Sequence, residues 1–395
     1  MTKFVIASHR LPVQLKGGQL IPSDGGLVSA LNDSGVEQNS AWVGSLGNTD
    51  NTLPNVTFLS KKSQKYQCVP LSSYFYSDFY NGFCNQVIWP GFHGRLDLVK
   101  SNKKFWNAYK TANNKYAEVI IMNNSCDTPV WIHDYHLMLL PEILKNYQCQ
   151  RKVGFFLHIP WPSLEECKRI PYLDKLANSL LTCDLVGFHN TTYVKNFINY
   201  IKYLHPNPNS EIRHFLKNNI QSIPIGIRAE RFAPNTKMRA KSAKKETVVL
   251  GLDRFDYSKN IDFKLYAFRN FLETYPQFRK KIVLKQLLIP TREDIPAYQD
   301  YRKEVLSLAQ QINSKFGTED WQPIDIKVGR LDPNELKDFY QGGDICLITS
   351  QRDGMNLVSM EFLASHSYFD PGKFVEIANG SSRQSGLVRI QRDVG

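Results

Sequence analysis

The chain has 395 residues, a length that predicts two domains rather than one. Hydrophobic residues make up 42% of it, with 23 Gly and 20 Pro, which excludes a disordered or fibrous protein. The net charge of +12 suits nucleic acid, a membrane surface or a small anionic substrate, but the densest basic run, residues 237–245, has no interleaved aromatic residues to stack on bases. Nucleic-acid binding is therefore disfavoured.

The cysteines and the N-terminus predict the compartment. Seven cysteines are scattered singly without a Cys-x-x-Cys pair, a pattern typical of free thiols in a reducing compartment and not of a zinc site. The start of the chain has one Lys and then a four-residue apolar run, too short for the core of a signal peptide, and no apolar stretch has membrane-spanning length. A cytoplasmic protein is expected.

Short apolar runs alternate with amphipathic segments along the chain, as in parallel sheets covered by helices. Helices are indicated where large apolar residues recur three or four apart, as from Tyr193 to Leu204 and from Tyr266 to Tyr275. The predicted strands are 4–7, 130–132, 153–157, 185–188 and 222–227 in the first half, and 248–252, 282–289, 326–328 and 345–349 in the second.

A polar and basic segment after Ala233 separates the two groups of strands. We therefore predict an α/β fold with two doubly wound domains, residues 1–236 and 237–395. In such sheets ligands bind beyond the carboxyl ends of the strands, so the residues that follow each strand form the candidate site.

Polar residues follow three strands of the first half. Arg10 follows the first strand, and Gly26 belongs to a later glycine pair whose backbone can approach a phosphate or a sugar, although such pairs are more often only turns. Asp134 follows the second strand between two histidines, and His158 follows the third. The histidines beside Asp134 lack further ligands and the chain has no Asp-x-Asp pair, so no metal site is predicted and Asp134 suits sugar hydroxyls better.

The second half carries sharper motifs. Arg254 and Lys259 follow strand 248–252, where the guanidinium can bind a diphosphate through two hydrogen bonds and the ammonium adds a point charge. Residues 349–357 combine a strand end, a glycine-containing loop and a helix start, an arrangement that binds anions, and Glu361 lies in the helix that follows. Ordinary surface ion pairing explains either motif alone equally well.

Together these motifs closely resemble the trehalose-6-phosphate synthase family of retaining glycosyltransferases, and the likeness covers nearly the whole chain. Residues 80–90, 95–97 and 292–295 extend the match. The resemblance implies the GT-B architecture of two Rossmann-like domains, with 1–236 binding the acceptor and 237–395 binding the nucleotide-sugar donor. So many matches in order are far more specific than any one motif.

The resemblance also implies a role for each matching position. The catalytic set contains Arg254, Lys259, Asp134 and His158, in which the two cations hold the donor diphosphate. The implied acceptor residues are Arg10, Tyr80, Trp89 and Arg292, and the implied donor residues are Gly26, Asp353, Gly354, Met355, Asn356, Leu357 and Glu361.

The implied reaction moves glucose, with retention, from UDP-glucose or another nucleoside-diphosphate glucose to glucose 6-phosphate, giving trehalose 6-phosphate. The nucleotide sugar is a substrate, and neither a cofactor nor a metal ion is implied. The leaving phosphate takes the proton of the acceptor in a front-face attack, so the paired carboxylates of glycosidases are not required. The partners are small molecules, with neither nucleic acid nor membrane expected, and a homo-oligomer is left open.

Three features depart from the family pattern. Position 9 is His where Asn is usual, and position 260 is Asn where Gly usually follows the Lys. Residues 373–395 drift from the pattern, which predicts a second domain that is incomplete at its C-terminal end. Two alternatives therefore stand beside the main interpretation: a related synthase with another acceptor such as glycerol 3-phosphate, and a catalytically silent sugar-nucleotide-binding homologue.

Overall fold

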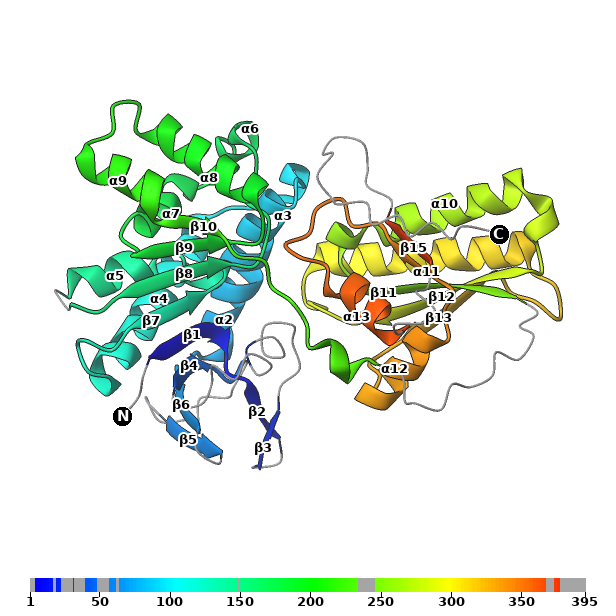
Figure 1. The fold of residues 1–395 in the computed structure, drawn as a ribbon, viewed down its shortest axis with the longest axis horizontal. Coiled ribbons are helices and arrows are strands. Elements are labelled where there is room, and N and C mark those ends of the chain that lie inside the picture. Colours follow the sequence, from blue (N-terminus) through cyan, green and yellow to red (C-terminus); the bar gives the residue numbers. More distant parts are fainter. Residues whose placement is uncertain are drawn as a thin grey trace. The chain divides into compact units, whose positions relative to one another are not determined.

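The computed structural model describes residues 4–16, 19–22, 31, 40–47, 57–61, 64–147, 150–233, 246–366 and 373–376. The chain forms two compact units, Met1–Ile225 and Gly226–Gly395, each with its own sheet and helices (Figure 1). The segment just after the division belongs to the second unit, because the ring of Phe232 packs 6.1 Å from that of Tyr340. The assignment of acceptor and donor binding to the two predicted domains stays a prediction.

The first unit is built on an eight-stranded sheet in which the described strands are parallel except β5. Its order is β10 (Ile220–Ser222), β9 (Leu185–Phe188), β8 (Val153–Leu157), β7 (Val130–His133), β1 (Val5–Arg10), β4 (Ala41–Ser45), β6 (Gln64–Cys68) and β5 (Thr57–Lys61). A separate hairpin pairs β2 (Val13–Lys16) with β3 (Gln19–Pro22). Val5, Ile6 and Ala7 of β1 are fully buried, as expected for a parallel strand covered on both faces.

The helices of the first unit follow the strands in alternation. They are α2 (Ser73–Tyr76), η1 (Ser77–Ile88), α3 (Trp89–Phe92), η2 (Leu96–Leu98), α4 (Lys103–Asn123), η3 (Tyr135–Leu137), α5 (Leu140–Asn146), α6 (Leu164–Cys167), α7 (Leu173–Leu180), α8 (Thr191–Leu204) and α9 (Ser210–Asn218). Asparagine begins several of them: the side chain of Asn190 accepts the backbone N–H of Tyr193 at 3.0 Å, which satisfies one of the otherwise unpaired donors of α8.

Helix η1 is a π-helix of 12 residues, much longer than the single-turn π-bulges that are usual inside helices. Side-chain amides reinforce its wide turns, because Asn85 donates to the carbonyl of Tyr80 at 2.7 Å and Gln86 donates to that of Asn81 at 3.0 Å. Its buried residue Phe83 packs on Tyr109 of α4 at a ring distance of 4.6 Å. The π-helix therefore carries the predicted acceptor residue Tyr80 on a well-packed element.

The second unit has a five-stranded parallel sheet in the order β13 (Ile324–Val328), β12 (Ile282–Ile289), β11 (Thr247–Arg254), β14 (Ile345–Ile348) and β15 (Lys373–Glu376). Helices α10 (Ile261–Thr274) and α11 (Pro296–Phe316) cover one face, and α12 (Pro333–Gln341) and α13 (Leu357–Ser365) cover the other (Figure 1). Short turns of 3₁₀ helix complete the unit: η4 (Ala229–Arg231), η5 (Tyr257–Lys259) and η6 (Pro276–Phe278). The α/β fold of two doubly wound units is confirmed.

Most predicted strands are present, with one clear exception. The prediction of a strand at 222–227 is wrong, because β10 ends at Ser222 and residues 223–228 form no strand. Pro224 has no N–H for a ladder hydrogen bond, which explains the early end. Strands β2 to β6 and β15 were not predicted; β6, for example, reads Gln-Lys-Tyr-Gln-Cys and shows no apolar run.

Two further expectations concern the environment of the chain. Among the described helices, none has the length and apolar character needed to cross a bilayer. Five cysteines, Cys68, Cys84, Cys167, Cys183 and Cys346, are buried free thiols, whereas Cys126 is disulfide-bonded. The expectation of free thiols throughout is therefore wrong at Cys126, because singly scattered cysteines give no sign in the sequence of which ones the fold brings together.

Candidate active site

Four of the predicted site residues lie where each sheet reverses its strand order. In the first unit the chain proceeds in opposite directions from β1, to β4 on one side and β7 on the other. In the second unit β11 lies between β12 and β14 in the same way. In doubly wound sheets the crevice beyond the carboxyl ends of such strands is the usual ligand site. Arg10 and Asp134 lie at the first of these points, and Arg254 and Asp353 at the second.

The end of β1 places a cation beside stacked rings. The imidazole of His9 stacks on Tyr80 at a centroid distance of 4.5 Å and on His136 at 4.4 Å. Nη2 of Arg10 donates to the hydroxyl of Tyr76 at 2.7 Å, and its guanidinium lies 5.5 Å from the ring centre of Tyr80. Arg10 and Tyr80 are therefore neighbours, and a guanidinium next to an aromatic face suits a sugar phosphate.

The ends of β7 and β8 are joined through Asp134 and His158. Oδ1 of Asp134 accepts the backbone N–H of His158 at 3.2 Å, and Nε2 of His158 lies 3.1 Å from Nδ1 of His133. Burial lowers the pKa of His133 to about 3 and, with the neighbouring histidines, lowers the pKa of His158 well below its usual range. Both rings are neutral at pH 7, so one of the two nitrogens donates a hydrogen bond and the other accepts it.

Trp89 lies at the junction of η1 and α3 and is 6% exposed. Its indole stacks on His93 at 4.1 Å and lies 5.7 Å from the ring of Tyr135. Most of its surface therefore packs within the first unit. A contact between Trp89 and an acceptor stays a prediction.

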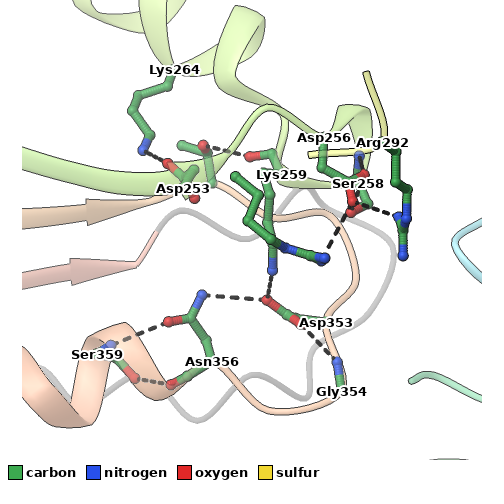
Figure 2. Close-up of polar contacts among 12 residues, drawn as sticks. Asp253, Asp256, Ser258, Lys259, Lys264, Arg292, Asp353, Gly354, Asn356 and Ser359 are labelled. Atoms are coloured by element: carbon green, nitrogen blue, oxygen red, sulfur yellow. Dashed lines mark hydrogen bonds and ion pairs between the residues drawn. The ribbon is translucent and has the colours of Figure 1, made fainter. Parts of the chain in front are cut away.

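In the second unit, one buried carboxylate contacts two of the predicted arginines. Oδ2 of Asp256 lies 3.4 Å from Nη2 of Arg254 and 3.1 Å from Nη1 of Arg292, and the Asp256 side chain is fully buried. Arg292 also donates from Nη1 to the hydroxyl of Tyr298 at 2.5 Å. Figure 2 shows Arg292 directed at Asp256 from a separate segment of the chain. Arg292, predicted for the acceptor, thus lies in the same unit as the donor residues.

Lys259 and Asp353 join the ends of β11 and β14 in a direct ion pair (Figure 2). The loop that follows is ordered by its own side chains, because Asp353 Oδ1 accepts the N–H of Gly354 at 3.0 Å and Asn356 Oδ1 accepts the N–H of Ser359 at 3.2 Å. Asn356 is thereby the N-cap of α13. Met355 lies within this loop and Leu357 is the first residue of the helix.

Glu361 lies on α13 and is held by a tyrosine from α12. Its Oε2 accepts the hydroxyl hydrogen of Tyr340 at 2.6 Å. Burial raises the pKa of Glu361, and the hydrogen bond from Tyr340 acts in the opposite direction. A carboxylate fixed in this way can accept hydrogen bonds from a ribose.

Several residues that shape the site were not predicted from the sequence. They are Asp256 and Tyr298 around Arg292, Tyr340 on Glu361, Tyr76 on Arg10 and His133 on His158. Asp256 had a usable signal, since a carboxylate two residues after Arg254 lies beyond the same strand end. The predicted donor residue Gly26 lies outside the described residues. Within the part of the chain that the structure describes, no group of three or more His, Cys, Asp or Glu side chains is placed to hold a metal ion.

Comparison with known proteins decides the family. The family model of glycosyltransferase family 20 matches residues 2–377. The chain belongs to glycosyltransferase family 20. Among relatives with this similarity, the UDP-forming alpha,alpha-trehalose-phosphate synthase A of Dictyostelium discoideum is 36% identical, with 91% of this chain and 52% of the relative covered. The corresponding synthase of Candida albicans is 35% identical, with 92% and 81% covered.

Solved structures agree with this family 20 membership. A UDP-forming trehalose-phosphate synthase from Burkholderia xenovorans in complex with glucose-6-phosphate has a TM-score of 0.84 at 27% identity, covering 95% of this chain and 85% of that one. An E. coli trehalose-6-phosphate structure bound with UDP-2-fluoro glucose has a TM-score of 0.82 at 29% identity, covering 94% and 84%. The chain thus spans about half the length of the Dictyostelium relative and most of the solved ones.

Proposed function

We propose that this family 20 protein is a retaining glucosyltransferase that moves glucose from UDP-glucose to glucose 6-phosphate and forms trehalose 6-phosphate. One observation carries the proposal: at the point where the second sheet reverses its order, Arg254, Lys259 and the start of α13 converge from the ends of β11 and β14. The family membership and the ligands in the names of its solved relatives agree with this chemistry.

The proposed mechanism is electrostatic. Breaking the bond between glucose and the diphosphate builds negative charge on the departing nucleotide and positive charge on the sugar ring. Fixed cations at Arg254 and Lys259, together with the positive end of α13, stabilise the first of these charges. The departing phosphate takes the proton of the acceptor hydroxyl on the same face of the sugar, so no nucleophilic carboxylate is needed.

The first unit supplies three of the four proposed acceptor residues, Arg10, Tyr80 and Trp89. Arg10 offers a guanidinium for the phosphate of glucose 6-phosphate, and Tyr80 beside it offers a ring face for the sugar. Asp134 and His158 are linked through a backbone hydrogen bond at the ends of β7 and β8. We assign Asp134 to hydroxyls of the acceptor ring and His158 to the donor sugar.

Release of uridine diphosphate from UDP-glucose, measured with and without glucose 6-phosphate in the presence of a chelator, tests the proposal. We expect release that depends on the acceptor and persists in chelator. Release with glycerol 3-phosphate in place of glucose 6-phosphate would support the related synthase instead. Donor binding without release would support the silent binding homologue.

A matched pair of lysine variants sharpens this test. Lys259→Ala should lower kcat/KM by roughly a hundredfold to a thousandfold, the usual effect of removing one group that stabilises developing negative charge. Lys280→Ala removes a lysine that is 52% exposed and paired with Asp320, and should leave kcat/KM unchanged. Near-normal turnover of the Lys259 variant would remove Lys259 from the mechanism.

Two expectations beyond the reaction are part of the proposal. Independence of metal ions is tested by the chelator arm of the same assay, and independence of cofactors by transfer with purified protein and the two substrates alone. The cytoplasmic location also stays a prediction: the five buried free thiols agree with a reducing compartment, and the disulfide-bonded Cys126 does not.

A further inference from the structure

Asp256 is the carboxylate on which two arginines of the second unit converge. It follows β11 by two residues, and its side chain is fully buried. A buried carboxylate is costly unless other groups compensate its charge, so the contacts of Asp256 indicate what it does.

Each oxygen of the Asp256 carboxylate has a separate set of partners. Oδ1 accepts the backbone N–H of Ser258 at 3.0 Å and its hydroxyl hydrogen at 2.8 Å, which fixes the start of the turn η5 that carries Lys259. Oδ2 lies between two guanidinium groups, at 3.4 Å from Arg254 and 3.1 Å from Arg292. Figure 2 shows Ser258 and Arg292 reaching Asp256 from different segments.

The two arginines differ in how far they are exposed. The Arg254 side chain is 37% exposed, while that of Arg292 is 4% exposed and also bonded to Tyr298. Under the proposed function, Arg254 serves the donor diphosphate and Arg292 the phosphate of the acceptor. One carboxylate oxygen therefore contacts a donor residue and an acceptor residue at the same time.

We propose that Asp256 is a positioning residue that sets the binding of both substrates at once. This inference rests on the proposed function and deepens it. Asp256 does not touch substrate; it aims Arg254 and Arg292 and holds the turn of Lys259. Because charge-assisted hydrogen bonds depend strongly on direction and charge, loss of this one carboxylate removes the shared partner of both arginines at once.

Asp256→Asn is the decisive variant, because it keeps the size and the acceptor for Ser258 but removes the charge between the arginines. We expect the KM values for UDP-glucose and for glucose 6-phosphate to rise together, each by roughly tenfold or more. Arg254→Lys should raise the KM of the donor alone and Arg292→Lys that of the acceptor alone. In the double variant Arg254→Lys with Asp256→Asn, the donor KM should rise no further than in Asp256→Asn, because contacting residues are not additive.

The control is Asp320→Asn, which changes the net charge equally at a side chain that is 73% exposed. It should leave both KM values unchanged. Thermal unfolding confirms that each variant is folded. If Asp256→Asn does not fold, Ser258→Ala removes only the hydroxyl donor to Oδ1 and should raise both KM values by a smaller factor.

A rise in only one KM overturns the inference, because Asp256 would then position one arginine alone. A lower kcat with both KM values unchanged also overturns it, because a merely structural role would produce that result. Failure of the proposed function is distinguishable, since it appears in the wild-type protein as an absence of transfer. In that case, dissociation constants for uridine diphosphate and glucose 6-phosphate, measured by calorimetry on the same variants, replace the KM values. If the wild-type protein binds neither ligand, both the proposed function and the inference about Asp256 are overturned.

Discussion

Asn260 has a left-handed backbone, with φ 51° and ψ 45°, between the turn η5 and helix α10. Its carbonyl and that of Lys259 both accept the hydroxyl hydrogen of Thr349, at 3.1 and 3.2 Å, which ties this corner to the end of β14. Glycine adopts this conformation most easily, and Asn is among the next most tolerant residues. Asn260, which stands where Gly usually follows the Lys, therefore preserves the backbone conformation of this turn.

We predict that Asn260→Gly folds as stably as the wild type, whereas Asn260→Ala lowers the free energy of unfolding by about 1 kcal/mol. Urea denaturation of the purified proteins measures both. Asn270→Ala, at an exposed position inside α10, is the control and should be neutral or slightly stabilising, since Ala is the better helix former. Equal losses at positions 260 and 270 would contradict a left-handed requirement.

Glu361 gives a prediction for pH. Because burial raises its pKa in the folded protein, the folded state holds a proton that the unfolded state has already lost. Its contribution to stability is therefore complete below the unfolded pKa and is lost as pH rises through the folded pKa. As pH rises above the pKa of the carboxyl in the unfolded state, the unfolding temperature of Glu361→Gln should therefore fall less than that of the wild type. The same variant should bind uridine diphosphate more weakly than the wild type at every pH. Thermal unfolding against pH and calorimetry with uridine diphosphate test the two effects.

A control for Glu361 is available on α11. Glu304→Gln changes an exposed carboxylate and should leave both the pH profile and nucleotide binding unchanged. Weaker nucleotide binding with an unaltered pH profile would place Glu361 in the site but contradict the effect of its burial. An unaltered affinity would remove Glu361 from the donor residues.

At the scale of an element, the packing of η1 on α4 controls where Tyr80 lies. A Cβ at Gly82 would come within 2.5 Å of Cδ1 of Phe105, so the two helices approach as closely as a glycine allows. Gly82→Ala should lower the free energy of unfolding by about 1 to 3 kcal/mol through overpacking and should raise the KM for the proposed acceptor. In the background of Phe105→Ala the same substitution should cost little, because the clashing ring is gone. Additive losses in urea denaturation would show that this contact does not set the packing.

The sequence predicted the central strands better than the edges. Strands β8 and β9 are short apolar runs, and β7 is one up to its final His133; a buried parallel strand needs such a run. Strand β5 at the edge of the first sheet and its neighbour β6 lack an apolar run of the length that predicts a strand. The π-helical turns of η1 depend on side-chain amides bonding to carbonyls five residues earlier, which no periodicity reveals. The site residues that follow the strands were predictable too, because an apolar run that predicts a strand also predicts where the strand ends. Their partners Asp256, Tyr298 and Tyr340 were not, because contacts across a unit depend on packing.

The backbone conformation of two predicted site residues is a further feature that the sequence did not predict, because both have a positive φ angle. Asp134 has a φ of 74° and Arg292 a φ of 51°, and residues other than glycine rarely adopt such positive values. Both follow strand ends of the doubly wound sheets, and such strain is concentrated at functional sites in proteins. The sequence placed both residues near a strand end but gave no sign of the backbone that presents them.

At the scale of the whole molecule, the predicted acceptor residues belong to different units. Arg10, Tyr80 and Trp89 lie in the first unit, and Arg292 lies in the second with the donor residues of 353–361. If Arg292 binds the acceptor phosphate, glucose 6-phosphate must slow amide exchange in segments of both units, because a ligand stabilises the backbone that it binds. Uridine diphosphate should slow exchange in the second unit at 254–259 and 353–361.

Hydrogen–deuterium exchange with each ligand separately tests this division. We expect glucose 6-phosphate to protect residues 80–89 and 132–136 of the first unit and 290–298 of the second, with helix α9 (Ser210–Asn218) as the unaffected reference. Protection confined to the first unit would remove Arg292 from the acceptor residues and leave it with Asp256 and Tyr298 as support for Arg254. Protection confined to the second unit would instead separate Arg10 and Tyr80 from the acceptor, and would require another ligand for the stacked rings at the end of β1.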